Sequence, residues 1–397
     1  SERWTVLRVG YASTGSVCSP ASDFGKGFEV DKLNSKALDR YFDGHIAKLV
    51  KVCGIDPSSD PMGRAGFNMV LVDSWEVGSQ NWTDGFEKTF EKICSYPIFG
   101  FLPCFAGFVV GSSEETEKFY DDFRKVIEEL FAKNYVGRLS QRCREAGIML
   151  SVEPYSNQPC STMRYGYDVD CPMSEFWWKP PSDLTIDRSC KYVSSLGHIL
   201  GRKYLGAESF TTFPEDGRWT QTPSDYKAIG DMAFANGVNR IVYHRYAHQP
   251  WTSHHAYPGM TMGYWGTHFE RTQTWWDFAS DWIKYQTRCQ YMLQEGVFKA
   301  DFLLYTGSSV PQFPKFAVCN GRNVIPEGYA FDFIEKSLLD KLEKTDDGFI
   351  KAPGGTKYRF IAVPDDEKDI PATGFKTVRY SDILKTLEEM GVKPSLQ

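Results

Sequence analysis

The chain has 397 residues, of which 42% are hydrophobic, and a formal net charge of −6. This length and apolar content predict one large core plus a second, smaller unit, and they exclude a disordered chain. Basic residues cluster at most in pairs, so the sequence argues against a nucleic-acid partner.

The longest nearly apolar stretch runs from Pro97 to Gly111, which is too short to cross a membrane. Pro103 inside this stretch favours a buried strand instead of a span. Ten cysteines are scattered without a CxxC element, so zinc, redox and haem signatures are absent. The chain opens at Ser1 without a methionine or signal peptide and ends at Gln397, so we expect both ends to be cut points.

Short β-branched runs alternate with longer helical patterns, which is typical of βα units around a parallel sheet. The candidate strands, in chain order, are Val6–Tyr11, Phe67–Val72, Ile98–Phe105, Ile148–Val152, Lys203–Ala207 and Arg240–Tyr243. A helix is predicted after the third of these, because Ser112 or Ser113 can cap it and its first turn is acidic. Helices are also predicted over Tyr226–Ala235 and Trp275–Glu295, the latter ended by Gly296.

After Gly296 the pattern restarts as a small doubly wound α/β unit. It predicts a strand at Ala300–Tyr305, a helix at Ala330–Glu343, a strand at Tyr358–Val363 and a helix at Tyr380–Met390. The expected domains are therefore 1–297 and 298–397, with the second stopping after two strands.

Two glutamates stand at the ends of apolar, β-prone runs, Glu76 in VLVDSWE and Glu208 in YLGAESF. A parallel barrel displays such strand ends at the mouth where catalysis occurs, and glycoside hydrolysis needs one carboxylic acid and one carboxylate. Asp73 is expected to keep Glu76 protonated by its negative charge, which favours Glu76 as the acid. Either glutamate could instead cap a helix or pair with an arginine.

A second set of acidic residues could hold calcium or bind sugar hydroxyls through its hard oxygen ligands. It comprises Glu153 in SVEPY together with Asp168, Asp170 and Glu175 in YDVDCPMSEFWW. The spacing does not match an EF-hand loop, so solvated loop acids are the competing interpretation. Glu29 and Asp31 in GKGFEVDK follow the first candidate strand and are expected to hydrogen-bond sugar hydroxyls.

Five of the seven histidines lie close together, at His244, His248, His254, His255 and His268. HRYAHQPW lacks the glutamate of a zincin motif, so hydrogen bonding to a hydroxylated ligand fits these histidines better than metal binding. A loop-bracing role is about equally compatible. Aromatic residues make up 15% of the chain and suit stacking on sugar rings, with Trp178 and Trp251 as candidates, although a single Trp is more often part of a core. No GxSxG, P-loop or GxGxxG pattern is present.

The motifs DSWE, QNWTDGF, EPY, DCPMSEFWW, LGAESFT, FANGVNRIVYHRYAHQPW and PGMTMGYWGTHFERTQTWW resemble the catalytic region of glycoside hydrolase family 106, the bacterial α-L-rhamnosidases. The resemblance extends from about Trp4 to Leu303. It implies a (β/α)8 TIM-type barrel, inverting hydrolysis of terminal α-L-rhamnosides in plant-type polysaccharides or glycosides, a calcium ion at the substrate site, and a bacterial periplasmic or secreted setting. By motif, Glu76 would be the general acid and Glu208 the general base, with Asp73 assisting.

If Glu76 ends the fourth barrel strand and Glu208 the seventh, then Val6–Tyr11 is the third strand and two βα units are expected to precede Ser1. Glu175 is the expected metal ligand among the residues present. Two alternatives stay open: a sugar-binding protein without activity, and a retaining β-galactosidase-like hydrolase on the same barrel. The sequence sets no oligomeric state.

Overall fold

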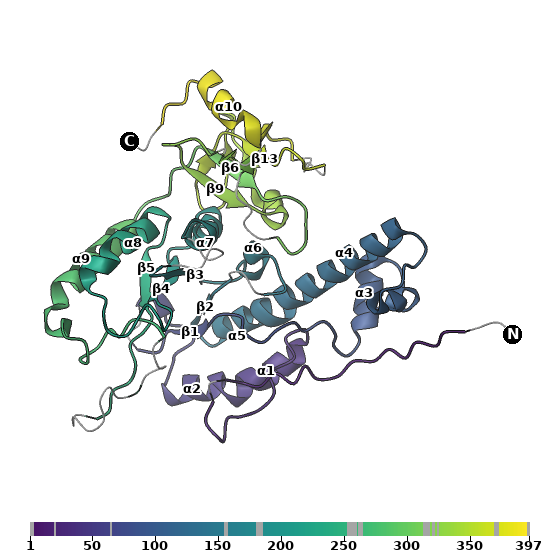
Figure 1. Cartoon of the computed structure of the whole chain (residues 1–397), viewed down its shortest axis with the longest axis horizontal. Coiled ribbons are helices and arrows are strands. Elements are labelled where there is room, and N and C mark those ends of the chain that lie inside the picture. The colour runs from purple at the N-terminus through teal and green to yellow at the C-terminus, as the bar shows by residue number, and fades with distance from the viewer. Residues whose placement is uncertain are drawn as a thin grey trace.

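The computed structural model describes residues 4–19, 21–63, 66–154, 158–179, 186–251, 260, 265–312, 318–319, 322–323, 325–368 and 373–394. It is an α/β structure with a parallel sheet in the larger part of the chain and a second parallel sheet near the C-terminus (Figure 1). Among the described residues, no helix is both long and apolar enough to cross a membrane.

The larger sheet consists of five parallel strands whose order in space is their order in the chain. Its strands are β1 (Met69–Val72), β2 (Met149–Val152), β3 (Cys171–Trp177), β4 (Gly206–Thr211) and β5 (Arg240–Tyr243). A barrel has this sequential order, whereas a doubly wound sheet reverses direction at a switch point. All five strands therefore present their carboxyl ends at the same edge.

Helices precede, connect and follow these strands. They are α1 (Ser35–Gly44), α2 (Ile46–Val52), α3 (Phe86–Cys94), α4 (Ser113–Leu130), α5 (Arg138–Glu145), α6 (Thr162–Tyr165), α7 (Ile186–Leu200), α8 (Pro223–Ala235) and α9 (Ser280–Leu293). A π-helical turn, Phe131–Gly137, joins α4 to α5. Short 3₁₀ turns are present at Pro61–Gly63 and Trp276–Phe278.

The capped helix predicted from the sequence is confirmed as α4. Ser112 is its N-cap, and the Ser112 hydroxyl accepts a hydrogen bond from the Glu115 N–H at 3.1 Å. The Glu115 carboxylate in turn accepts from the Ser112 N–H at 2.9 Å, which completes a capping box.

Three of the predicted strands differ from the structure. Val6–Tyr11 is exposed and adopts no regular strand in the part of the chain described. Ile98–Phe105 lies in a 3₁₀ helix, Ile98–Ala106. The Phe101 and Phe105 rings of this segment both pack against Phe119 of α4, and Pro103 lacks the N–H that a β-ladder needs. The predicted strand at Lys203–Ala207 begins later, at Gly206. Strand β3 was not predicted, since Pro, Ser and Glu interrupt its apolar pattern.

Gly206 shows why β3 and β4 pair closely. A Cβ atom at this position would lie 2.5 Å from the Met173 side chain on the neighbouring strand. Glycine avoids this close contact. Two residues later, Glu208 is the register partner of Glu175.

The C-terminal part contains four parallel strands in the order β14, β13, β6, β9. They are β6 (Phe302–Tyr305), β9 (Phe331–Ile334), β13 (Ile361–Val363) and β14 (Thr377–Arg379). The prediction of two strands was therefore too low, although the switch in strand order next to β6 is that of a doubly wound sheet. The predicted helix at Ala330–Glu343 is wrong: its first part is β9, followed by a 3₁₀ turn at Lys336–Lys341.

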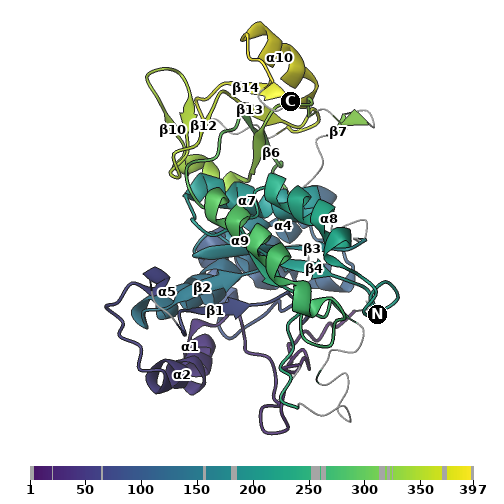
Figure 2. The ribbon, with the colours of Figure 1, turned by 90° about the vertical axis from the view of Figure 1, so that its left-hand side faces the viewer.

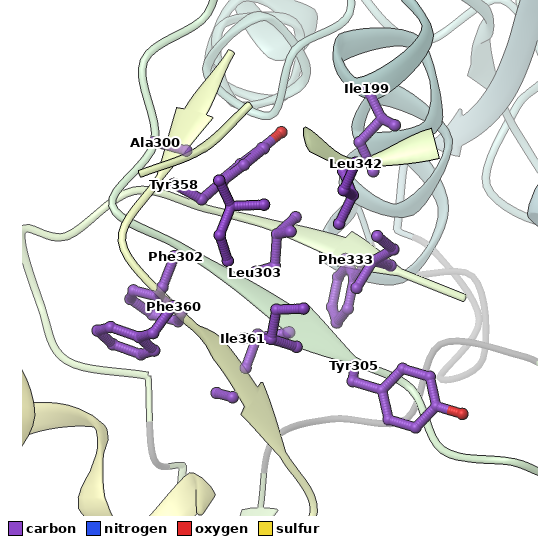
Figure 3. Close-up of a cluster of buried hydrophobic side chains, with 14 of the residues drawn as sticks. Ile199, Ala300, Phe302, Leu303, Tyr305, Phe333, Leu342, Tyr358, Phe360 and Ile361 are labelled. Atoms are coloured by element: carbon purple, nitrogen blue, oxygen red, sulfur yellow. The ribbon is translucent and has the colours of Figure 1, made fainter. Parts of the chain in front are cut away.

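A two-stranded and a three-stranded antiparallel sheet and one helix complete the described residues of this part. They are β7 (Val318–Cys319) with β8 (Arg322–Asn323), β10 (Glu343–Lys344) with β11 (Ile350–Lys351) and β12 (Lys357–Tyr358), and helix α10 (Ile383–Glu389) after a 3₁₀ turn at Tyr380–Asp382. Figure 3 shows the apolar cluster of this part, in which the Phe302 and Phe360 rings stack with centroids 5.4 Å apart.

Helix α7 lies between the two sheets and packs on both β3 and β9 (Figure 2). A buried charge cluster joins α7 to β9. The Asp332 carboxylate accepts hydrogen bonds at 2.9 Å from the Lys191 ammonium and the Tyr358 hydroxyl, and lies 2.9 Å from His198 Nδ1. The nearby cations hold the pKa of Asp332 below its usual value although the residue is fully buried.

Candidate active site

Four consecutive strands of the larger sheet each carry one carboxylate at or near their carboxyl end. Asp73 directly follows β1 and Glu153 directly follows β2, and the residues before them, Val72 and Val152, are partners in register. Glu175 in β3 is the register partner of Glu208 in β4. Because parallel strands end at the same edge of the sheet, four residues up to 135 positions apart in the chain converge there.

Three of these side chains lie within direct reach of one another. A carboxylate oxygen from each of Asp73, Glu153 and Glu208 lies within 4.8 Å of the others. Glu153 is 1% exposed, and neither of its carboxylate oxygens accepts a hydrogen bond from the part of the chain that the structure describes. A buried carboxylate without donors is costly to ionise, so this group requires a proton, a cation or a ligand.

The carboxylates raise one another's affinity for protons. Burial, together with the negative charges of Glu175 and Asp73, raises the pKa of Glu208 to about 8, whereas the Thr211 hydroxyl opposes the shift. Burial and the charges of Glu208, Asp73 and Glu175 raise the pKa of Glu153 well above its usual value. Carboxylates with strongly shifted pKa values are typical of acid–base sites, and carboxylates in contact titrate as a coupled group.

A β-bulge positions the Thr211 hydroxyl on Glu208. Opposite Phe176 and Trp177 of β3, β4 contributes Ser209, Phe210 and Thr211, so one residue is extra. Phe210 occupies the left-handed region with φ 66°, which is strained for a bulky residue. In a regular strand, residues three apart face opposite sides of the sheet. The bulge brings Thr211 to the face of Glu208, where its hydroxyl donates to Glu208 Oε1 at 2.7 Å.

His244 borders the same group at the end of β5. Its Nδ1 lies 3.5 Å from Glu208 Oε1, a contact without hydrogen-bond geometry. Burial, assisted by the positive charge of Arg245, lowers the pKa of His244 to about 4. The imidazole is therefore neutral at pH 7 and can offer either a donor or an acceptor to a bound hydroxyl group.

Glu175 makes its own contact at the edge of the cluster. Its Oε1 accepts a hydrogen bond from the Trp177 indole, which lies two residues further along β3 and therefore on the same face. The Glu175 N–H donates to the Ser189 hydroxyl at 3.0 Å. Among the described residues, Glu175 is not a member of the three-residue group whose ligand atoms lie mutually within 4.8 Å.

Glu76 is exposed, three residues beyond Asp73, and its Oε1 accepts a hydrogen bond from the Ser74 hydroxyl at 3.0 Å. It is not a member of the group formed by exposed Asp73, buried Glu153 and half-buried Glu208. Trp178 faces the opposite side from Trp177, packing edge-on against Tyr226 with ring centroids 6.1 Å apart. His248 and Trp251 are exposed, whereas His254 and His255 lie outside the described residues.

Glu29 and Asp31 lie at a different place from the carboxylate group. Glu29 pairs with the Lys32 ammonium at 2.7 Å, and Asp31 accepts a hydrogen bond from the Thr83 hydroxyl at 2.6 Å. Both line a cavity of about 1360 Å³ that Trp82 also borders.

Thr211 and Trp177 were not anticipated from the sequence. The alternation in SEFW would have placed Trp177, and not Trp178, on the face of Glu175 had β3 been recognised. Thr211 had no comparable signal, because a bulge changes the alternation.

The group fits a hard cation by its chemistry. Asp73, Glu153 and Glu208 supply only oxygen ligands, and among the described residues no hydrogen-bond donor reaches the two Glu153 oxygens. Calcium and magnesium prefer such ligands. Their positive charge would also offset the repulsion that raises the pKa of Glu208.

Three comparisons with known proteins each give a match. The family model described as alpha-L-rhamnosidase matches residues 1–394. A protein of Formosa agariphila named "Putative beta-glucuronidase" is 38% identical over 396 residues, which is 98% of this chain and 32% of that protein. The chain thus spans about a third of the length of this relative.

The structure of a rhamnosidase from Novosphingobium sp. PP1Y superimposes with a TM-score of 0.82 and 24% sequence identity. The match covers 96% of this chain and 41% of the solved chain. At this identity the likeness concerns the fold, a curled parallel sheet in an α/β structure.

Proposed function

Because the chain belongs to the alpha-L-rhamnosidase family, glycoside hydrolase family 106, we propose that it contains the catalytic centre of a glycosidase that hydrolyses terminal α-L-rhamnosides with inversion. The substrates would be plant-type polysaccharides or glycosides. The observation that carries this proposal is the convergence of Asp73, Glu153 and Glu208 within 4.8 Å at the carboxyl ends of adjacent strands.

The proposed barrel agrees with the order of the strands. If β1 is the fourth strand of a (β/α)8 barrel, β4 is the seventh, because β2 and β3 lie between them. Glu76 then follows strand four and Glu208 lies on strand seven. This is the spacing expected of the general acid and the general base.

In the proposed reaction, Glu208 as general base removes a proton from a water molecule that attacks the anomeric carbon. Glu76 donates its proton to the leaving glycosidic oxygen, so that one bond forms on one face of the sugar and one breaks on the other. The exposure of Glu76 suits a group that must meet a leaving group of variable size. His244, neutral and beside Glu208, would hydrogen-bond a sugar hydroxyl.

Glu208 can act as a base only when it is ionised, yet its pKa is about 8. A calcium ion held by Asp73, Glu153 and Glu208 would supply positive charge and orient sugar hydroxyls. Because neither Glu153 oxygen accepts a hydrogen bond from the described residues, the Glu153 carboxylate is available to such an ion. The Thr211 hydroxyl favours the ionised form of Glu208 in addition.

The name of the Formosa agariphila relative suggests a glucuronide as the competing substrate. A uronate would bring a further negative charge beside this group, and each carboxylate that is ionised would repel it. A neutral 6-deoxy sugar avoids this repulsion, so a rhamnoside fits the site better than a glucuronide does.

The acid and base roles can be separated by the leaving group. Glu76→Gln should hydrolyse 4-methylumbelliferyl α-L-rhamnoside slowly but keep most of its rate on the 2,4-dinitrophenyl rhamnoside, whose leaving group needs no protonation. Glu208→Gln should lose both rates, because water activation is needed in each case. Equal losses of Glu76→Gln on both substrates would refute the acid role.

A further inference from the structure

Three aromatic rings meet next to the carboxylate group. They are Trp177 at the end of β3, Phe213 just after β4, and Trp265 in the segment that follows β5. The Trp177 and Phe213 centroids are 4.5 Å apart, Trp265 stands edge-on to Trp177 at 6.1 Å, and Phe213 and Trp265 are 5.8 Å apart. We name these three residues the aromatic wall.

The aromatic wall is anchored to the candidate active site at both sides. On one side, the Trp177 indole donates its hydrogen bond to Glu175. On the other, the Gly266 N–H donates to the Thr212 carbonyl at 3.1 Å, which fixes the chain next to Trp265 at the end of β4. Gly266 has φ +71°, and a Cβ atom there would lie 2.9 Å from the ring of His244. His244 in turn lies 3.5 Å from Glu208.

Exposure distinguishes this wall from the aromatic core on the other face of the sheet. Trp265 is 40% exposed, whereas Trp177 and Phe213 are half-buried beside it. The rings of the aromatic core, such as Phe210 and Tyr226, are fully buried. An indole held in place by two rings and left open to solvent next to catalytic groups is suited to binding the apolar part of a ligand.

We infer that the aromatic wall binds the C5 methyl group of a 6-deoxyhexose and thereby selects this sugar over those with a hydroxymethyl or carboxylate group at C5. This inference rests on the proposed function. The Trp177 N–H already donates to Glu175, and Phe213 has no polar group, so a sugar hydroxyl placed against these rings would lose hydrogen bonds to water. A carboxylate would in addition lie close to Glu175.

The test uses two substrates that differ only at C6, 4-nitrophenyl α-L-rhamnoside and 4-nitrophenyl α-L-mannoside. The wild-type chain should prefer the rhamnoside in kcat/KM by about 10- to 100-fold, the range that one hydroxyl on a methyl group produces in an apolar pocket. Trp265→Ala should reduce this preference at least fivefold, and Trp265→Leu, which keeps an apolar side chain, should retain most of it. Phe278→Ala removes an aromatic ring that is 82% exposed and should leave the preference unchanged.

Calorimetric binding of free L-rhamnose and L-mannose separates this inference from the proposed function. If the chain binds L-rhamnose more tightly than L-mannose, loses this difference in Trp265→Ala, and hydrolyses no rhamnoside, the proposed function is wrong and the role of the aromatic wall is supported. If Trp265→Ala still hydrolyses both substrates but loses kcat/KM equally on each, the role of the aromatic wall is wrong and the proposed function is unaffected. If Trp265→Ala melts at a lower temperature, Trp265→Leu and Phe213→Leu provide the comparison. A preference lost in Trp265→Leu as fully as in Trp265→Ala would also overturn the inference.

Discussion

The electrostatic account of Glu208 can be tested by two substitutions that should act in opposite directions. Glu175 raises the pKa of Glu208 by its charge, and the Thr211 hydroxyl lowers it. Glu175→Gln removes the charge but keeps an oxygen that can accept from the Trp177 indole. Thr211→Val removes the hydroxyl at nearly constant volume. We predict that the first lowers the pKa of Glu208 and that the second raises it.

The magnitude follows from the geometry of the sheet. Carboxylates on adjacent strands, roughly 4.8 Å apart, repel by about 3.5 kcal/mol at an effective dielectric constant of about 20. This corresponds to at most about 2.5 pKa units. Since the Glu208 side chain is 18% exposed, water screens part of the repulsion, and we expect a decrease on the order of one unit. Loss of a hydrogen bond to a charged group, about 1.5 kcal/mol, predicts an increase of about one unit for Thr211→Val.

The assay is a ¹³C NMR titration of side-chain carboxyls in metal-free protein, with the Glu208 signal assigned by its loss in Glu208→Gln. Thr212→Val is the matched control, because the Thr212 hydroxyl makes no hydrogen bond to Glu208. The acidic limb of kcat/KM should move in the same directions, since Glu208 must be ionised to act as a base. Shifts of equal sign in Glu175→Gln and Thr211→Val, or a shift in Thr212→Val, would refute the reasoning.

Three further predictions concern metal binding and stability. Calcium affinity should rise between pH 6 and pH 8, because Glu153 and Glu208 bind protons at neutral pH and calcium must displace them. The increase should be up to about tenfold per pH unit for each proton displaced, and calorimetry with measurement of proton release tests it. An affinity independent of pH would contradict the proposed ligands. Asp332→Asn should reduce the free energy of unfolding by about 3–5 kcal/mol in denaturant titrations, since it leaves Lys191 buried without its charge partner, whereas Asp340→Asn, at an exposed position, should cost far less. The pKa of Asp332 is depressed in the folded state, so the stability that its carboxylate contributes is present above about pH 4 and is lost as the pH falls below that value. If Asp332→Asn lost as much stability in acid as the wild type, this account of Asp332 would be wrong. Ser112→Ala should cost about 1 kcal/mol through loss of the α4 cap, and an unchanged midpoint would show that the capping box contributes little.

The position of the two strand-end glutamates was predicted from the sequence with two compensating errors. The run Ile98–Phe105 was expected to be a strand and is a 3₁₀ helix, because a continuous apolar run suits either structure. Strand β3 was missed, since CPMSEFW carries polar residues that are buried in the folded sheet. One strand was therefore added and one omitted, and Glu208 still lies three strands after β1.

The composition of the carboxylate group could be foreseen only in part. All four residues are candidates from the sequence: Glu208 as a strand-end glutamate, Asp73 through its position near Glu76, and Glu153 and Glu175 as members of the second acidic set. Which of them meet depends on the register of neighbouring strands, and no local pattern encodes that register. The bulge at Phe210 was likewise invisible, since its left-handed backbone is imposed by packing and not by a glycine. Local sequence thus identifies the acidic residues, and the sheet selects their partners.

The most direct test of the central claim is ¹H NMR of the anomeric proton during hydrolysis of 4-nitrophenyl α-L-rhamnoside, with the wild-type chain and with Glu208→Gln. The account predicts that β-L-rhamnose appears first and that the substitution reduces its rate of formation by at least about 100-fold. Initial release of α-L-rhamnose, or undiminished turnover by Glu208→Gln, would contradict it.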